Sequence, residues 1–113
     1  MVKYSPRQGD IVGVDLDPTK GREQRGNRLT LVVSNDRFYK RTGLLIVCPI
    51  SNTKNTFSLH IPLEDSLKTT GSVLTQQIRT IDPVACEISY MERVSTYYIK
   101  EILDVVELFF DDQ

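Results

Sequence analysis

The sequence contains no tryptophan, and it has only one histidine and two cysteines among its 113 residues. The single histidine, His60, and the separated cysteines Cys48 and Cys86 are too few to close a structural zinc site. The carboxylates also lack the spacing of a calcium loop or a two-metal centre. The cysteines form no CxxC pair, so we expect both to remain thiols that pack in or near the core. These shortages argue against metal catalysis.

Long hydrophobic runs are absent as well. No apolar stretch approaches the roughly 18 to 20 residues that a membrane helix requires, and the first residues, MVKYSPRQGD, lack the apolar segment of a signal peptide. We therefore expect a cytoplasmic protein that does not associate with membranes. Hydrophobic residues make up 40% and charged residues 26% of the chain, as in ordinary globular proteins. The length suits a single domain, which we expect to cover residues 1–113.

Several catalytic signatures are also missing. The sequence has no GxxxxGK[ST], no GxGxxG and no GxSxG, so the usual cues for nucleotide cofactors and for elbow-type hydrolases are absent. His60 could act as a general base, but a lone histidine on the solvent-exposed face of a strand is more often a surface residue without a catalytic role. A ribonuclease mechanism that uses two histidines would need a second histidine, which this sequence does not contain.

The charges are unevenly distributed along the chain. The net charge is only −1, which argues against binding of nucleic acid by bulk charge alone. Residues 1–60 nevertheless carry ten Lys and Arg against five Asp and Glu, whereas residues 61–113 carry four against ten. Lys20, Arg22, Arg25 and Arg28 crowd one short stretch, opposed only by Glu23. This stretch is either a local phosphate site or a solvated loop.

The hydrophobic pattern predicts six short strands. They lie within residues 11–16, 29–34, 44–50, 57–63, 72–76 together with 78–81, and 88–94. The alternation in 57–63 places His60 on the outward face, and Pro49 requires an edge or a bulge near the end of its strand. Many short strands with one terminal helix favour a small, strongly curved sheet or barrel, mainly β with a C-terminal α-helix.

Two helices are indicated by their capping residues. Asn35 and Asp36 can cap a short helical turn over RFYKR, which Gly43 ends. Ser95 is an acceptable N-cap for an amphipathic helix, whose apolar residues recur at helical spacing. These residues are Ile99, Ile102, Leu103, Val106 and Phe110.

Arginine chemistry remains as the candidate function of the basic stretch. Guanidinium groups match phosphate oxygens and stabilise the negative charge that grows during phosphoryl transfer. Arg28 stands where the loop of residues 18–28 enters the second predicted strand, so its backbone can be anchored while its side chain reaches a groove. On charge alone, a plain surface arginine is an equally good interpretation.

Four segments together resemble the MazF/PemK family of toxins. They are DLDPTKGREQRGNR at 15–28, LVVSND at 31–36, CPIS at 48–51 and QQIRTID at 76–82, and the resemblance covers most of residues 9–110. It implies an SH3-like barrel with a C-terminal helix, assembled as a homodimer. It also implies the toxin of a type II toxin–antitoxin system, an mRNA interferase that cleaves single-stranded RNA at specific sequences and inhibits translation and growth.

The resemblance further implies the chemistry and the partners. The products are a 2′,3′-cyclic phosphate and a 5′-hydroxyl end, and neither a metal nor another cofactor is implied. The partner is a cognate antitoxin similar to MazE or PemI, whose acidic and hydrophobic tail covers the RNA groove. Binding of DNA is expected only through the complex with that antitoxin.

The family's functional positions fall on particular residues of this sequence. The essential arginine corresponds to Arg28, the catalytic hydroxyl to Ser51, and a loop glutamate to Glu23, which is either a general base or an ion-pair partner of Arg28. Gln77 and Arg79 either contact RNA or make buried structural hydrogen bonds. The full set of implied RNA-binding residues is Lys20, Arg22, Gln24, Arg25, Asn52, Thr53, Gln77 and Arg79.

The sequence departs from the usual family pattern at three positions. Leu29 replaces the proline that commonly follows the essential arginine, and Ser51 replaces threonine. Gln76 replaces a carboxylate that some relatives use in acid–base chemistry. Serine keeps the hydroxyl and loses only the methyl group that restricts its rotamer, so we expect catalysis to survive. Two alternatives remain: a gyrase poison that uses the same barrel without nuclease chemistry, and a member that only binds antitoxin or nucleic acid.

Overall fold

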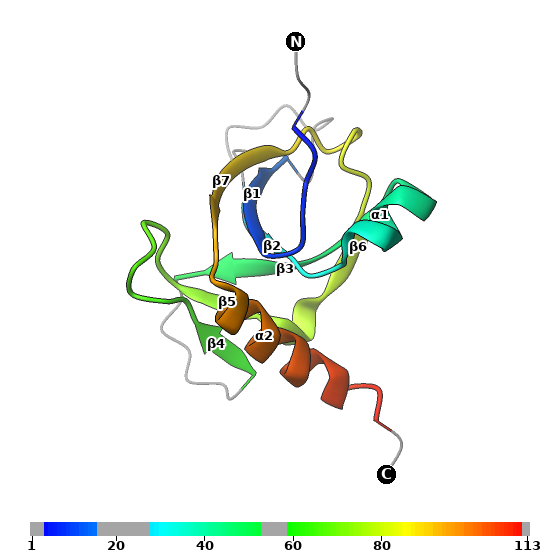
Figure 1. Cartoon of the computed structure of the whole chain (residues 1–113). Coiled ribbons are helices and arrows are strands. Elements are labelled where there is room, and N and C mark those ends of the chain that lie inside the picture. The colour runs from blue at the N-terminus through cyan, green and yellow to red at the C-terminus, as the bar shows by residue number, and fades with distance from the viewer. Residues whose placement is uncertain (1–3, 16–27, 53–58, 112–113) are drawn as a thin grey trace.

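The computed structural model describes residues 4–15, 28–52 and 59–111. Within these residues the chain forms seven strands, two α-helices and one 3-10 helix, η1 (Figure 1). The strands are β1 (Asp10–Val14), β2 (Arg28–Val32), β3 (Leu45–Ser51), β4 (His60–Pro62), β5 (Ser72–Leu74), β6 (Arg79–Ile81) and β7 (Ser89–Arg93). The helices are α1 (Asp36–Thr42), η1 (Thr75–Gln77) and α2 (Thr96–Leu108).

The described strands form one antiparallel sheet that bends at β3. Its order is β4-β5-β3-β2-β1-β7, and β6 pairs with β3 off this path. Residues Leu45 to Val47 of β3 pair with β6, whereas Ile50 and Ser51 pair with β5. Pro49 lies between these two stretches and has no N–H to give to a neighbouring strand. The described residues thus form seven strands where six were predicted, because 72–76 and 78–81 pair with different ends of β3.

Two predicted strand boundaries were wrong. β1 ends at Val14, two residues before the predicted end, because the N–H of Asp15 donates to the carbonyl of Cys86 at 3.0 Å instead of extending the ladder. The strand predicted over 57–63 is limited to His60–Pro62 among the described residues. The first part of that prediction, residues 57 and 58, lies outside them.

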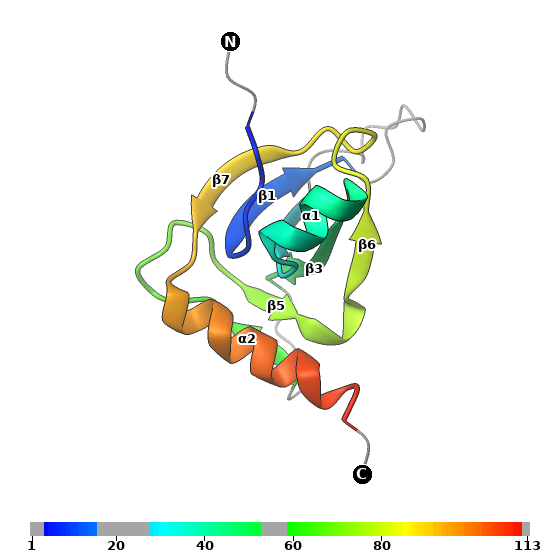
Figure 2. The same ribbon diagram turned by 45° about the vertical axis from the view of Figure 1, so that its right-hand side comes forward.

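The buried residues of the strands alternate between two cores, as the twofold period of a strand requires. One core is packed against α2 and includes Ile11, Leu31, Cys48, Val73, Tyr98, Ile99 and Ile102. The other lies on the opposite face, with Tyr39 of α1 packed against it, and comprises Val12, Val14, Val32, Leu45, Val47 and Ile81. Figure 2 shows α1 and α2 on different sides of the strands. The alternation places Arg28, Ser51 and Arg79 on the face of the second core, away from α2.

Both predicted N-caps are confirmed. The Asn35 side chain accepts a hydrogen bond from the N–H of Phe38, and Gly43, with φ 74°, ends α1. The Ser95 side chain accepts from the N–H of Tyr98 at the start of α2. No helix in the described part of the chain has the length and apolar character needed to cross a membrane.

Phe110 does not belong to the apolar face of α2, so that prediction was wrong. The helix ends at Leu108, and Phe110 is 74% exposed. The N–H groups of Phe109 and Phe110 bond to the carbonyls of Val106 and Glu107, three residues back. This tighter winding rotates the chain out of the helical spacing on which the prediction rested.

The two cysteines are thiols, as predicted. Cys48 is fully buried in the core under α2, and burial raises the pKa of its thiol to about 12. Cys86 is partly buried against the second core. Cys48 therefore stays protonated at neutral pH and serves packing.

Candidate active site

The strand register brings the two principal predicted residues together. Thr30 of β2 pairs with Pro49 of β3, and the next two pairs continue the same antiparallel register. Because β2 and β3 are antiparallel, the first residue of β2 and the last residue of β3 lie at the same end of this strand pair. Arg28 is exposed and is the first residue of β2, whereas Ser51 is half-buried and is the last residue of β3. A guanidinium and a hydroxyl therefore belong to neighbouring strand ends, although they are 23 positions apart in the sequence.

The turn before β5 holds the end of β3 in place. Ser72 pairs with Ser51, and the Thr70 hydroxyl donates to Asn52 Oδ1 at 3.1 Å. Gly71 has a φ of 118°, and a Cβ on it would lie only 2.6 Å from the carbonyl oxygen of Ser51. Only glycine permits this approach of one backbone to another. Gly71 therefore fixes the backbone beside Ser51, and in the sequence its only signal was a glycine among hydroxyl residues.

The same turn is tied to β7 by Glu92. The carboxylate of Glu92 accepts hydrogen bonds from the N–H groups of Lys68 and Thr69 and from the Thr69 hydroxyl. The bond from the Thr69 hydroxyl, with the two backbone bonds, lowers the pKa of Glu92. An ionised Glu92 thus fixes the segment that carries Gly71 against the sheet.

Gln77 and Arg79 lie beside β3 with exposed side chains. Gln77 is the last residue of η1, which packs against β3. Arg79 begins β6 and pairs with Val47, on the sheet face that also carries Ser51. Both residues are exposed, which contradicts the alternative of buried structural hydrogen bonds. Their side chains are accessible to a ligand.

His60 is not an isolated surface residue. It is half-buried, and its Nε2 lies 2.9 Å from the side-chain Nε2 of Gln76. The Gln76 amide donates this bond when the imidazole carries its proton on Nδ1. The pairing of Pro62 with Ser72, and of Ser72 with Ser51, places His60 on the same face as Ser51. Sixteen residues separate the two partners, and no sequence pattern indicated their contact.

Asn52 lines a groove of about 310 Å³ beside the end of β3. Leu29, which departs from the family pattern, is also part of this wall and is partly buried. The groove is completed by Lys68, Thr69, Thr70, Met91 and Glu92. It offers both polar and apolar walls beside the residue that follows β3.

The remaining predicted site residues fall outside the described part of the chain. These are Lys20, Arg22, Glu23, Gln24, Arg25 and Thr53. Among the described residues, no group of three or more His, Cys, Asp or Glu side chains could hold a metal ion.

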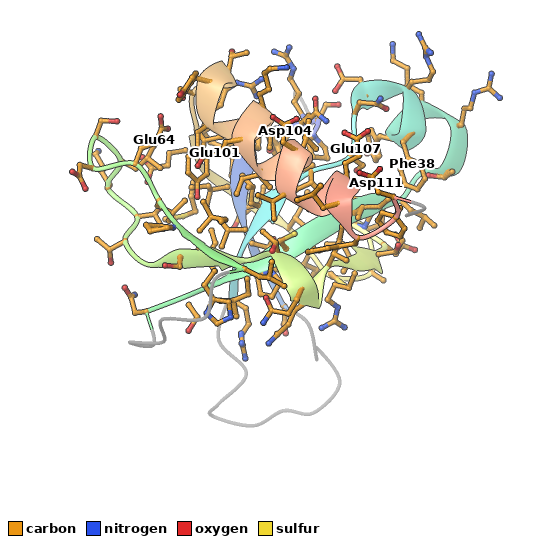
Figure 3. All side chains as sticks on the ribbon, turned by 90° about the horizontal axis from the view of Figure 1, so that it is seen from below. Phe38, Glu64, Glu101, Asp104, Glu107 and Asp111 are labelled. Atoms are coloured by element: carbon orange, nitrogen blue, oxygen red, sulfur yellow. The ribbon has the colours of Figure 1, made fainter. Side chains whose placement is uncertain are left out.

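The charge asymmetry of the sequence becomes a spatial one in the fold. Figure 3 shows a row of carboxylates along α2 and its flanks, the acidic ridge formed by Glu64, Glu101, Asp104, Glu107 and Asp111. Arg28 and Arg79 belong to the opposite sheet face. A polyanion is repelled from α2 and attracted to the face with the arginines.

Fold and site together define a small antiparallel, barrel-like protein with an exposed arginine and a serine hydroxyl at neighbouring strand ends. The family model described as PemK-like, MazF-like toxin of type II toxin–antitoxin system matches residues 7–110. The chain belongs to this toxin family. The resemblance noted from the sequence motifs is thereby confirmed.

Curated relatives and solved structures agree with this assignment. The chain is 36% identical over 105 residues to the endoribonuclease PemK of Escherichia coli, across 89% of this chain and 79% of the relative. It is 32% identical over 79 residues to the endoribonuclease toxin MazF of Escherichia coli strain K12, across 70% of each chain.

The predicted fold class is confirmed by two solved structures. The MazE–MazF complex (Form-II) of Deinococcus radiodurans matches with a TM-score of 0.81 at 20% identity, over 96% of this chain and 97% of that chain. An endoribonuclease in complex with its cognate antitoxin from a mycobacterial species matches with a TM-score of 0.77 at 20% identity, over 94% of this chain and 95% of that chain.

Proposed function

We propose that this protein is the toxin of a type II toxin–antitoxin pair and cleaves single-stranded RNA at specific sequences, with Arg28 and Ser51 as catalytic residues. Membership of the toxin family and curated relatives named as endoribonucleases support the activity. The observation that carries the assignment of residues is the antiparallel pairing of β2 and β3, which puts Arg28, the first residue of β2, and Ser51, the last residue of β3, at the same end of the strand pair. Cleavage of messenger RNA inhibits translation and growth.

The reaction uses the RNA 2′-hydroxyl as its nucleophile. The 2′-oxygen forms a bond to the adjacent phosphorus and loses its proton, while the bond to the 5′-oxygen breaks and that oxygen gains a proton. The products are a 2′,3′-cyclic phosphate and a 5′-hydroxyl end, and DNA resists cleavage because it lacks the nucleophile. Arg28 stabilises the charge on the pentavalent phosphorus. Ser51 holds a phosphate oxygen or the 2′-hydroxyl.

Arg28 itself is a poor general base. A guanidinium group presents five N–H donors and no acceptor, so it has no lone pair with which to take up a proton. Glu23 has two candidate roles, as the base or as an ion-pair partner that positions Arg28. RNA contacts extend over Lys20, Arg22, Gln24, Arg25, Asn52, Thr53, Gln77 and Arg79.

The partners follow from the same family. The MazE–MazF structures and the mycobacterial complex contain an antitoxin, which supports a MazE- or PemI-like antitoxin that covers Arg28. We also propose a homodimer that encloses RNA between its protomers, since Leu108 and Phe110 expose 66% and 74% of their surfaces. Contact with DNA occurs only through the antitoxin complex, and the protein acts in the cytoplasm.

Incubation of the purified protein with a long unstructured RNA in EDTA tests this function. We expect discrete cuts at a recurring sequence, with cyclic phosphate ends, and no cuts in a DNA of the same sequence. Mapping of the ends by primer extension and by phosphatase sensitivity reads the outcome. Absence of cuts would contradict the nuclease assignment, and inhibition of gyrase without RNA cleavage would favour the gyrase alternative.

Replacement of Ser51 by alanine should lower kcat/KM about 10- to 100-fold, because a hydrogen bond to a charged group is worth roughly 1.5–3 kcal/mol. Ser51→Thr should retain most of the activity, since it keeps the hydroxyl. Ser72→Ala is the matched control, because it removes the same group from the partner strand. Equal losses for Ser51→Ala and Ser72→Ala would show that the Ser51 hydroxyl has no special role.

A further inference from the structure

A second cluster of arginines lies at the far end of β1 from the candidate active site. Arg28 pairs with Val14 at one end of β1, whereas Arg93 pairs with Asp10 at the other. A pocket of about 390 Å³ opens beside Arg93. We call it the Arg93 pocket, and its walls are Arg7, Gln8, Asn35, Asp36, Arg37 and Arg93.

The buried carboxylate of Asp10 fixes one wall of the Arg93 pocket. Asp10 is 3% exposed, and its Oδ1 accepts a bond from Arg93 Nη1 at 2.7 Å. Its Oδ2 accepts from the Arg7 backbone N–H at 3.0 Å and from the Tyr4 hydroxyl. The side chain of Arg93 is still 43% exposed, and a guanidinium has five N–H donors. Arg93 is therefore held in position while it keeps donors for a ligand.

Two more guanidinium groups line the Arg93 pocket, those of Arg7 and Arg37. Arg37 is exposed in the first turn of α1. Arg7 Nε lies 4.0 Å from Asp36 Oδ2, and both side chains are more than half exposed, so this ion pair is weak. Asp36 is the only acidic residue among the six that line the pocket. Three guanidiniums around one concave space suit a phosphate group.

An exposed pair of tyrosines lies next to the arginines on the same sheet face. Val12 pairs with Tyr90 and Asp10 pairs with Arg93, with a register shift between them. Tyr90 and Arg93 are three positions apart, which in a regular strand would put them on opposite faces. The bulge adds one residue to β7 between the two pairs, so Tyr90 and Arg93 lie on the same face. The Tyr4 and Tyr90 rings are 5.4 Å apart and keep 39% and 49% of their surfaces exposed. Figure 2 shows the N-terminal segment, β1, β7 and α1 gathered at this side.

We infer that the Arg93 pocket binds a phosphate of the RNA substrate outside the cleaved linkage, with a neighbouring base stacked on Tyr90. This inference rests on the proposed ribonuclease function. Basic grooves with exposed aromatic rings are the usual means of holding single-stranded nucleic acid. β1 spans about 13 Å between its ends, so the pocket is too far from Arg28 to hold the phosphate that reacts. The contact therefore lengthens the stretch of RNA that the enzyme grips.

Binding of an uncleavable RNA tests the inference independently of catalysis. The probe is a fluorescein-labelled 2′-O-methyl RNA of about 20 nucleotides, a length that exceeds the site size of one small barrel. Anisotropy titrations of the full chain should give a Kd about fivefold higher for Arg37→Ala than for wild type. The slope of log Kd against the logarithm of the salt concentration should be smaller by about one. Arg41→Ala is the matched control, because Arg41 is an exposed arginine of α1 that does not line the pocket.

A second pair of variants tests the aromatic part. Tyr90→Ala should weaken binding of the same probe at least about fivefold, whereas Tyr97→Ala, at a tyrosine that is 81% exposed at the start of α2, should not. Thermal melts check that all four variants fold. Equal Kd values for Arg37→Ala and Arg41→Ala in folded proteins would overturn the inference.

Cleavage assays separate failure of this inference from failure of the proposed function. A long RNA and a short oligonucleotide with the same cut site are compared as substrates. Arg37→Ala should remove the KM advantage of the long substrate over the short one. Wild type that cuts neither RNA would refute the ribonuclease function, while the anisotropy result would still decide whether the pocket binds RNA. A loss of kcat with the short substrate would overturn the inference, because it would place Arg37 in the reaction itself.

Discussion

Replacement of Arg28 by alanine should reduce RNA cleavage about a thousandfold and leave the fold intact. Loss of one donor to a developing negative charge typically lowers kcat by roughly 10²–10³, and in the proposed mechanism Arg28 also binds the phosphate. Because Arg28 is exposed at the first position of β2, its removal opens no cavity in the core. Initial rates on a defined RNA give kcat/KM, and a thermal melt reports stability.

The controls for Arg28 separate charge from geometry. Arg28→Lys keeps the charge and loses the planar pair of donors, so its activity should lie between wild type and Arg28→Ala. Arg79→Ala removes an exposed arginine from the same sheet face and should affect KM more than kcat. Full cleavage by a folded Arg28→Ala variant would remove Arg28 from the mechanism.

The exchange Gly71→Ala should damage stability and catalysis together. A Cβ at this position lies 2.6 Å from the Ser51 carbonyl oxygen and 3.2 Å from Asn52 Oδ1, at a φ of 118°. Backbone strain of this kind costs about 1–3 kcal/mol, and relief of the clash must displace the end of β3. Denaturant titration measures the free energy of unfolding. The value of kcat/KM at denaturant concentrations below the unfolding transition measures the activity of the folded variant.

Gly43 provides the matched control for Gly71. It also has a positive φ, 74°, but among the described residues no atom beyond its chain neighbours lies within 4 Å of the place a Cβ would take. Gly43→Ala should therefore cost stability by about 1 kcal/mol through strain alone and leave kcat/KM of the folded protein unchanged. If Gly71→Ala behaves like Gly43→Ala, the close contact with Ser51 has no role in catalysis.

Local features of this chain could be predicted from the sequence because their physical cause is local. Asn35, Gly43 and Ser95 act on backbone groups within four residues of themselves, so the residue type and the neighbouring pattern were sufficient. The prediction of the apolar face of α2 was also correct as far as Val106. It failed at Phe110, where the winding of the last turn changes and no residue signals the change.

The candidate site could be predicted only in part, because its geometry is not local. The family motifs indicated Arg28 and Ser51, but their alignment depends on the register between β2 and β3. The contact between His60 and Gln76, the approach of Gly71 to Ser51 and the Arg93 pocket all join segments that are distant in sequence. Strand pairing sets these contacts, and single-sequence patterns do not encode it.

The separation of charge described above gives the described part of the molecule an electric dipole moment. The acidic ridge on α2 is its negative pole, and the arginine face of the sheet is its positive pole. A net charge of −1 gives no overall attraction to RNA, but a dipole exerts a torque near a polyanion and turns the positive pole towards it. Productive encounters with RNA are thus selected by orientation during diffusion, before any side chain touches a phosphate.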